Sequence, residues 1–217
     1  MFDNFDIQGL LLMVVPVILA LTVHEYAHAL AAHKLGDDTA KNAGRLTLNP
    51  LAHLDPIGTL MLFFSKLFGW AKPVPFNPAN FRNPVRDSTL VALAGPVSNL
   101  ITAVAVAVAI IFKIFIVFDL FRLLPRSSVQ DVADILSYAI LINVAIGVFN
   151  MLPIPPLDGF KVLSYFLPHR WVVASYQYST AFFAGFVVLI VLGLPQKAIS
   201  PVIYFLQSII YKVILNP

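Results

Sequence analysis

Residues 89–112 read TLVALAGPVSNLITAVAVAVAIIF, a run without a charged side chain. A helix needs about 20 apolar residues to cross the roughly 30 Å hydrocarbon core of a bilayer, and this run is long enough. Two further uncharged runs, at residues 135–157 and 171–195, also reach that length. The sequence therefore predicts several membrane-crossing helices.

The composition agrees with a chain that lies in lipid. Of the 217 residues, 59% are hydrophobic and 12% are charged, and the mean hydropathy is +0.85. A soluble domain is usually about 45–50% apolar and about 25% charged. The formal charge of +3 does not indicate nucleic-acid binding, because that function needs a basic face on a solvated fold. The chain has no cysteine, which excludes disulfides, thiolate metal ligands and cysteine nucleophiles.

The first apolar run is interrupted by ionisable residues. Residues 9–23 are uncharged, and the pattern continues through HEYAH at residues 24–28 into ALAA at residues 29–32. Together these residues reach a spanning length. Asp3 and Asp6 precede the run and no basic residue does, which favours a retained helix over a cleaved signal peptide.

The last apolar run is ambiguous. Residues 198–211 carry no charge but contain Pro201, and they fit a membrane span or an interfacial helix equally well. We therefore expect an all-α polytopic membrane protein with about four to six membrane helices. We also expect one membrane-embedded domain over residues 1–217.

The basic residues indicate on which side of the membrane the connection between the first two spans lies. Half of the fourteen basic residues lie in residues 34–88, and by the positive-inside rule this segment faces the cytoplasm. The end of the first span and the end of the third span then lie on the cytoplasmic side of the cell membrane. Four prolines within residues 70–84 exclude a regular helix there, which predicts a short extended or re-entrant segment.

The pattern H-E-x-x-H occurs at His24, Glu25 and His28. On a helix the two histidines lie one turn apart on one face, where both imidazoles can bind one metal ion, and the glutamate lies beside them. Ionisable residues in a membrane helix are costly and usually have a function. The alternative is that these are polar residues solvated at a helix end.

A catalytic zinc site needs three protein ligands and an open position for water. Without cysteine, the third ligand must be a histidine or a carboxylate. Asp158 stands out because three prolines precede it and interrupt the helix there, and irregular backbone at membrane depth occurs only within protein or a water-lined cavity. Asp158 could instead cap the next helix. The other candidates are His33, His53, His169, Asp37, Asp38 and Asp55.

Further motifs follow the same order as in a known family. LDG at residues 157–159 follows an Asn-x-x-Pro segment that begins at Asn150. The chain also contains NPLAHLDP at residues 49–56, GWAKPVPFNP at residues 69–78 and GPVSN at residues 95–99. With H-E-x-x-H, these motifs resemble the site-2 protease family of intramembrane zinc metalloproteases over nearly the whole chain.

The resemblance implies a site and a reaction. It implies His24, His28 and Asp158 as ligands of one zinc ion, Glu25 as general base, and Asn150 and His53 as supporting residues near the scissile bond. Zinc would make a bound water acidic, and Glu25 would take its proton as the water attacks the peptide carbonyl. The implied substrate is a transmembrane protein in the lipid bilayer, cleaved within or near its spanning segment. We expect a minimal member without a PDZ or CBS domain, in an oligomeric state that the sequence leaves open.

Two other functions are compatible with these residues. A zinc or proton-coupled transporter also places His and Asp among broken helices, and a family member without turnover would act as a membrane interaction protein. Glu25 argues against both, because neither function requires a base directly after the first metal ligand.

Two features have competing interpretations. Residues 69–78 could offer an edge on which an unwound substrate segment adds as a strand, or they could form a plain surface loop, since the prolines leave few N–H groups. Asn99 lies near Gly95 and Ser98, which favours close helix packing with an interhelical hydrogen bond over a contact with the metal site.

Overall fold

The computed structural model describes residues 7–65, 69–121 and 126–210. In this part of the chain the regular structure is helical, without a strand, and the elements follow in this order: α1 (Ile7–Lys34), α2 (Thr39–Asn42), η1 (Pro50–Ala52), α3 (Pro56–Ser65), η2 (Pro78–Asn80), α4 (Pro84–Phe121), α5 (Arg126–Asn150), α6 (Asp158–Ser164), α7 (His169–Gln177), α8 (Ser179–Val191) and α9 (Leu194–Ile210). The predicted all-α fold is confirmed.

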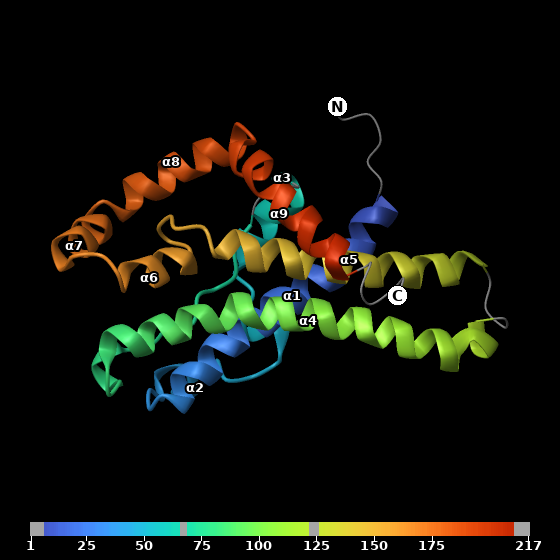
Figure 1. Ribbon diagram of the computed structural model, residues 1–217, viewed down its shortest axis with the longest axis horizontal. Coiled ribbons are helices and arrows are strands. Elements are labelled where there is room, and N and C mark those ends of the chain that lie inside the picture. Colours follow the sequence, from blue (N-terminus) through green and yellow to red (C-terminus); the bar gives the residue numbers. More distant parts are fainter. Residues whose placement is uncertain (1–6, 66–68, 122–125, 211–217) are drawn as a thin grey trace.

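Three helices form the centre of the molecule. Helices α4 and α5 run side by side along its length, and α1 packs against both (Figure 1). Each contains a stretch long and apolar enough to cross a membrane, at Leu12–Lys34, Pro84–Ile110 and Asp131–Asn150. The interrupted apolar run at the start of the chain is therefore one continuous helix through HEYAH, as predicted.

Small side chains bring α4 and α5 close together. Ala103 and Ala107 on α4 form a buried cluster with Ile140 and Val144 on α5. A Cβ atom at Gly147 of α5 would lie 3.1 Å from the carbonyl oxygen of Pro96, so a larger residue here would crowd this contact between the helices. Close contact through small residues is the usual way in which membrane helices associate.

The outer faces of the long helices are apolar. Large hydrophobic side chains are exposed there, among them Val15 and Leu19 on α1 and Val97, Ile101 and Val104 on α4. A soluble monomer rarely exposes contiguous apolar surface of this kind. These faces fit contact with lipid, in agreement with the composition.

The connection between α1 and α4 combines short helices with an extended stretch. Residues 69–77 form neither a helix nor a regular strand, as the prolines predict, and Ala71 pairs with Leu54 in an isolated antiparallel bridge. We refer to residues 69–77 as the extended segment. Its far end is tied to the end of α1, because the buried carboxylate of Asp37 accepts hydrogen bonds from Asn77 N at 2.7 Å and Asn80 Nδ2 at 2.7 Å.

The predicted span over residues 171–195 differs from the structure, which has two helices there. Helix α7 ends at Gln177 and α8 begins at Ser179. An uncharged run alone does not reveal this break.

Helix α9 contains residues 198–210 of the ambiguous last run, and residue 211 lies outside the described residues. The helix packs against α5, and Ile203 contacts the buried cluster between α4 and α5. In the described residues α8 and α9 are shorter than the three candidate spans. The total of four to six membrane helices therefore stays a prediction.

Candidate metal centre

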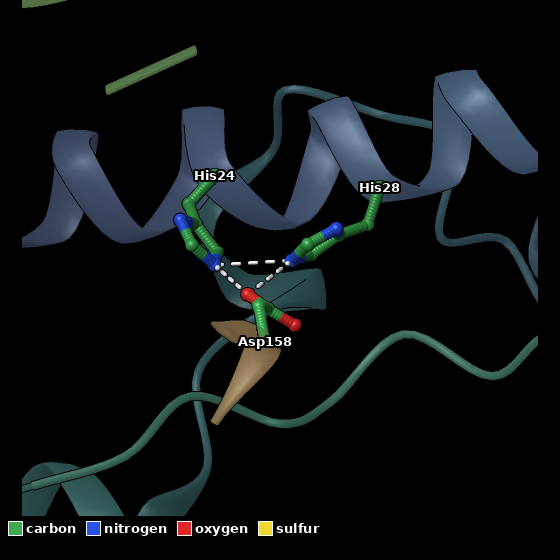
Figure 2. A group of neighbouring side chains, drawn as sticks. All are labelled: His24, His28 and Asp158. Carbon is green, nitrogen blue, oxygen red and sulfur yellow. Dashed lines mark hydrogen bonds and ion pairs between the residues drawn. The ribbon is translucent and has the colours of Figure 1, made fainter. Parts of the chain in front are cut away.

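Two elements distant in sequence bring three candidate ligands together. His24 and His28 lie one turn apart on α1, and Asp158 is the first residue of α6 (Figure 2). Asp158 Oδ2 lies 3.1 Å from His24 Nε2 and 3.1 Å from His28 Nε2, and the two Nε2 atoms are 3.0 Å apart. All three side chains are buried.

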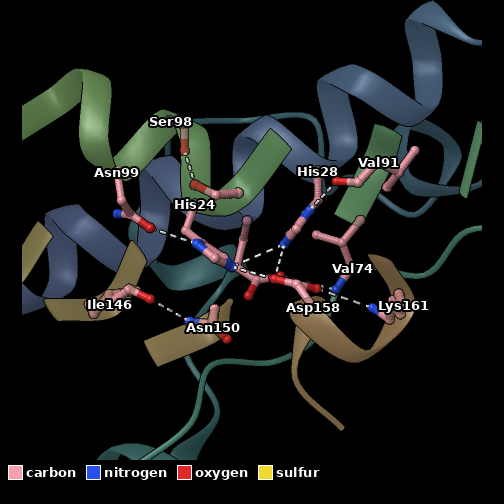
Figure 3. A network of polar contacts seen from close by, with 12 residues as sticks. His24, His28, Val74, Val91, Ser98, Asn99, Ile146, Asn150, Asp158 and Lys161 are labelled. Atoms are coloured by element: carbon pink, nitrogen blue, oxygen red, sulfur yellow. Dashed lines mark hydrogen bonds and ion pairs between the residues drawn. The ribbon is translucent and has the colours of Figure 1, made fainter. Parts of the chain in front are cut away.

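The remaining ring nitrogens fix the orientation of both imidazoles (Figure 3). His28 Nδ1–H donates to the carbonyl oxygen of Val91 at 2.7 Å. His24 Nδ1–H donates to Asn99 Oδ1 at 2.6 Å. The Asn99 amide itself donates to Asn143 Oδ1 at 2.9 Å and to the carbonyl of Ala20 at 3.0 Å. In each neutral ring the proton is therefore on Nδ1, and the lone pair on Nε2 points toward Asp158.

This arrangement suits a metal ion. The two Nε2 lone pairs and the carboxylate oxygen are all hydrogen-bond acceptors and cannot pair with one another. A cation between them can bind all three. Zinc bonds of about 2.0–2.1 Å in a tetrahedron place neighbouring ligand atoms about 3.3 Å apart, close to the 3.0–3.1 Å observed. A partner that orients the second nitrogen of a ligand histidine is usual at metal sites.

Gly95 on α4 leaves the space in which the two rings lie. A Cβ atom at this position would be 2.5 Å from His28 Nε2 and 2.6 Å from His24 Nε2. Real Cβ atoms do not approach other atoms this closely, so a side chain here would displace both imidazoles. The sequence pattern around Gly95 indicates helix packing, and the structure adds this contact with the two histidines.

Asp158 is presented by the proline-rich turn after α5. Leu157 occupies the N-cap position of α6, so Asp158 does not cap this helix. Gly159 lets the turn close, because its Cβ atom would lie 2.2 Å from the carbonyl oxygen of Met151. Asp158 Oδ1 accepts from Lys161 Nζ at 3.3 Å, which leaves Oδ2 toward the histidines.

The carboxyl of Asp158 is ionised at neutral pH. Burial raises its pKa, but the net shift is downward, and the nearby charge of Lys161 contributes to lowering it. A carboxylate must be deprotonated to bind a metal ion, so this residue is in the protonation state that metal binding requires.

Glu25 faces the same cavity and contacts the extended segment. The side chain is buried, and Oε2 accepts a hydrogen bond from Val74 N at 3.1 Å. The cavity has a volume of about 490 Å³, and its walls come from α1, the extended segment, α4, α5, α6 and α8. Most of the wall is apolar, and the polar side chains in it are His24, Glu25, His28, Asn150, Asp158 and Lys161.

The two predicted supporting residues lie in different places. Asn150, at the end of α5, lines the cavity and donates from Nδ2 to the carbonyl of Ile146 at 3.0 Å. His53 is fully buried and contacts Thr47 and Arg45 rather than the three candidate ligands. It braces the extended segment, because its carbonyl oxygen accepts from Lys72 N at 2.8 Å.

Other candidate ligands have other partners. The surface residue His33 pairs with Asp38, Asp37 holds the extended segment, and Asp55 accepts from Gly58 N at 2.7 Å. Within the described residues, His24, His28 and Asp158 form the group that could hold a metal ion. Asn99 makes the predicted interhelical hydrogen bonds and also contacts His24, which the sequence interpretation had not favoured.

Comparison with known proteins identifies the family. The model of "Peptidase family M50" matches residues 114–192. "Putative zinc metalloprotease YwhC" from Bacillus subtilis is 38% identical over 211 residues, which cover 93% of this chain and 91% of that protein. The chain belongs to peptidase family M50, the site-2 protease family. The family resemblance of the sequence motifs is thereby confirmed.

Two relatives with lower sequence identity also match. "Putative zinc metalloprotease Rip2" from Mycobacterium tuberculosis H37Rv is 32% identical over 157 residues, which cover 70% of this chain and 54% of that protein. "Putative zinc metalloprotease MJ0611" from Methanocaldococcus jannaschii is 29% identical over 178 residues, 80% of each chain. No solved structure matches the chain.

Proposed function

We propose that this M50 peptidase is an intramembrane zinc metalloprotease that hydrolyses peptide bonds within or near transmembrane segments of other proteins. One observation carries the proposal: three metal-binding side chains converge beside a buried glutamate in a largely apolar cavity. The names of the relatives, which specify zinc metalloproteases, support the choice of metal and reaction.

In this proposal His24, His28 and Asp158 hold one zinc ion. The ion, when bound, supplies a Lewis acid that acidifies water and polarises the scissile carbonyl. Glu25 takes a proton from the attacking water and passes it to the leaving amine. Val74 N–H holds one oxygen of this carboxylate, and Asn150 contributes its amide at the cavity wall.

The substrate is a transmembrane segment that unwinds to expose its backbone. A helix in lipid has all of its backbone groups paired, so cleavage requires a local break. Val74 and Phe76 of the extended segment line the cavity, and an unwound chain would lie against these side chains. Simple strand addition at residues 72–74 is less favourable, since Arg45 and Glu25 already bind backbone groups there.

We propose that the cavity lies near the cytoplasmic face of a multi-pass cell-membrane protein. His28 precedes the basic connection of residues 34–88, and Asp158 follows α5 on the same side of the molecule. Access to water is easier near a membrane face than at the bilayer centre, which eases hydrolysis in lipid.

Reconstitution with a candidate transmembrane substrate tests the proposal. Wild type should cleave it, and Glu25→Gln, which is nearly isosteric, should keep zinc and lose at least about 100-fold in rate, since general-base catalysis contributes about 10²–10⁴-fold. Equal cleavage by the variant would exclude Glu25 as base. Zinc transfer across the bilayer without cleavage would instead identify a transporter, and neither activity would fit an interaction protein.

A further inference from the structure

Arg45 is a buried cation that the proposed reaction does not use. It lies after α2, and 5% of its surface is exposed. Its guanidinium donates from one terminal nitrogen to the carbonyl of Pro73 at 3.1 Å and from the other to the carbonyl of Lys72. A buried charge is costly unless its hydrogen bonds are made. We therefore expect the buried guanidinium of Arg45 to have a specific role.

His53 holds the guanidinium in place. His53 Nε2–H donates to the carbonyl oxygen of Thr47 at 2.8 Å, which leaves Nδ1 as an acceptor for the second terminal nitrogen of Arg45 at 3.5 Å. The backbone of His53 binds Lys72 N. Arg45 and His53 thus fix the chain at residues 72 and 73 from one side.

The residue that follows contacts the proposed base. Pro73 and Pro75 have no backbone N–H, so Val74 carries the single backbone donor of residues 73–75, and this donor binds Glu25 Oε2 at 3.1 Å. The charge of Glu25 also acts on Arg45: burial lowers the pKa of the guanidinium, and Glu25 opposes that shift. Arg45 is therefore linked to Glu25 through one peptide unit and through charge.

We propose that Arg45 is a positioning residue for the general base. Its planar fork fixes the carbonyls of Lys72 and Pro73, and this aims Val74 N–H at Glu25 and orients the carboxylate toward the cavity. The inference rests on the proposed function, in which Glu25 is the base. Lysine, a point charge on a flexible stem, cannot bind two carbonyls with the same geometry.

The test uses purified full-length protein with a transmembrane substrate. Arg45→Met should lower kcat by about 10- to 100-fold, the scale of lost hydrogen bonds to a charged group, with a smaller change in KM and unchanged zinc content. Arg45→Lys should recover part of kcat. Arg82→Met, at an exposed arginine of the same connection, is the matched control and should leave both parameters unchanged.

Hydrogen exchange provides a readout that is independent of activity. In Arg45→Met, peptides covering residues 70–77 should exchange at least about tenfold faster than in wild type, while peptides of α4 should not change. This comparison separates local loosening of the segment from global unfolding. It also detects a variant that has merely failed to fold.

Several results would overturn the inference. An unchanged kcat in Arg45→Met would do so, as would a loss confined to KM, because the segment would then only hold substrate. Unchanged exchange at residues 70–77 would contradict the link to Val74. If wild type cleaves no substrate, the proposed function is wrong. Hydrogen exchange at residues 70–77 then tests by itself whether Arg45 fixes the backbone at Val74.

Discussion

Gly95 determines how closely α4 approaches the two histidines. Gly95→Ala would place a Cβ atom within 2.6 Å of both Nε2 atoms, so we expect zinc affinity to fall at least about tenfold, as it does when contacts that orient metal ligands are disturbed. Zinc titration against a competing chelator measures the effect. Gly185→Ala on α8 is the control, because its Cβ atom has open space; equal zinc affinity in the two variants would contradict this account.

Asn99 fixes the ring of His24. Asn99→Leu removes the acceptor for His24 Nδ1–H and leaves a buried donor without its partner. We expect zinc affinity to fall by about 10- to 100-fold, the usual effect of losing such a partner. Thr102→Val, one turn further along α4, removes only a bond to the carbonyl of Ser98 and should bind zinc as wild type does. If Asn99→Leu bound zinc as tightly as wild type, the His24 ring would not need its hydrogen bond to Asn99.

At the residue scale, sequence patterns indicate functional side chains that lie on the same face of one helix. The spacing of His24, Glu25 and His28 follows directly from the helical period. The turn after α5 singled out Asp158 because prolines interrupt the helix there. Gly95 and Arg45 were not found in this way, since their roles depend on contacts with residues distant in sequence, which no local pattern encodes.

The extended segment lines the cavity and is the element that we propose to lie against an unwound substrate. Val74→Asp and Phe76→Asp each place a negative charge on the apolar cavity wall near Glu25, so we expect cleavage to fall at least about tenfold while zinc stays bound. Rates and zinc content of the two single variants provide the measurement.

Ala79→Asp is the control for these charges, because Ala79 is exposed in η2 beyond the cavity. Unchanged turnover in both cavity variants would mean that substrate does not lie against this segment. Loss of zinc together with turnover would mean that the substitutions act on the metal centre.

At the element scale, proline patterns were more informative than apolar runs. The prolines at residues 73, 75 and 78 predicted an extended stretch, and those after Asn150 predicted the end of α5. The uncharged run over residues 171–195 predicted one span, but the structure has separate helices there, because hydropathy does not report where a helix ends.

At the scale of the molecule, the orientation in the membrane can be measured directly. The chain has no cysteine, so single cysteines can be introduced cleanly at Leu51, in the basic connection, and at Ser128, before the third candidate span. In intact cells an impermeant maleimide should label Ser128→Cys and not Leu51→Cys. The reverse pattern would place the cavity on the opposite face.

The composition and charge pattern predicted a membrane-embedded, all-helical chain, because lipid imposes length and polarity on every span. They did not predict how α1, α4 and α6 meet. The packing of the helices depends on small residues such as Gly95 and Gly147, because a larger side chain at either position would crowd neighbouring atoms.

Elemental mass spectrometry of the purified protein measures whether His24 and His28 on α1 and Asp158 on α6 hold one zinc ion together. We expect about one zinc per chain in wild type and in Glu25→Gln, and loss of zinc in Asp158→Ala. Full zinc occupancy in Asp158→Ala at the same affinity would contradict this ligand set.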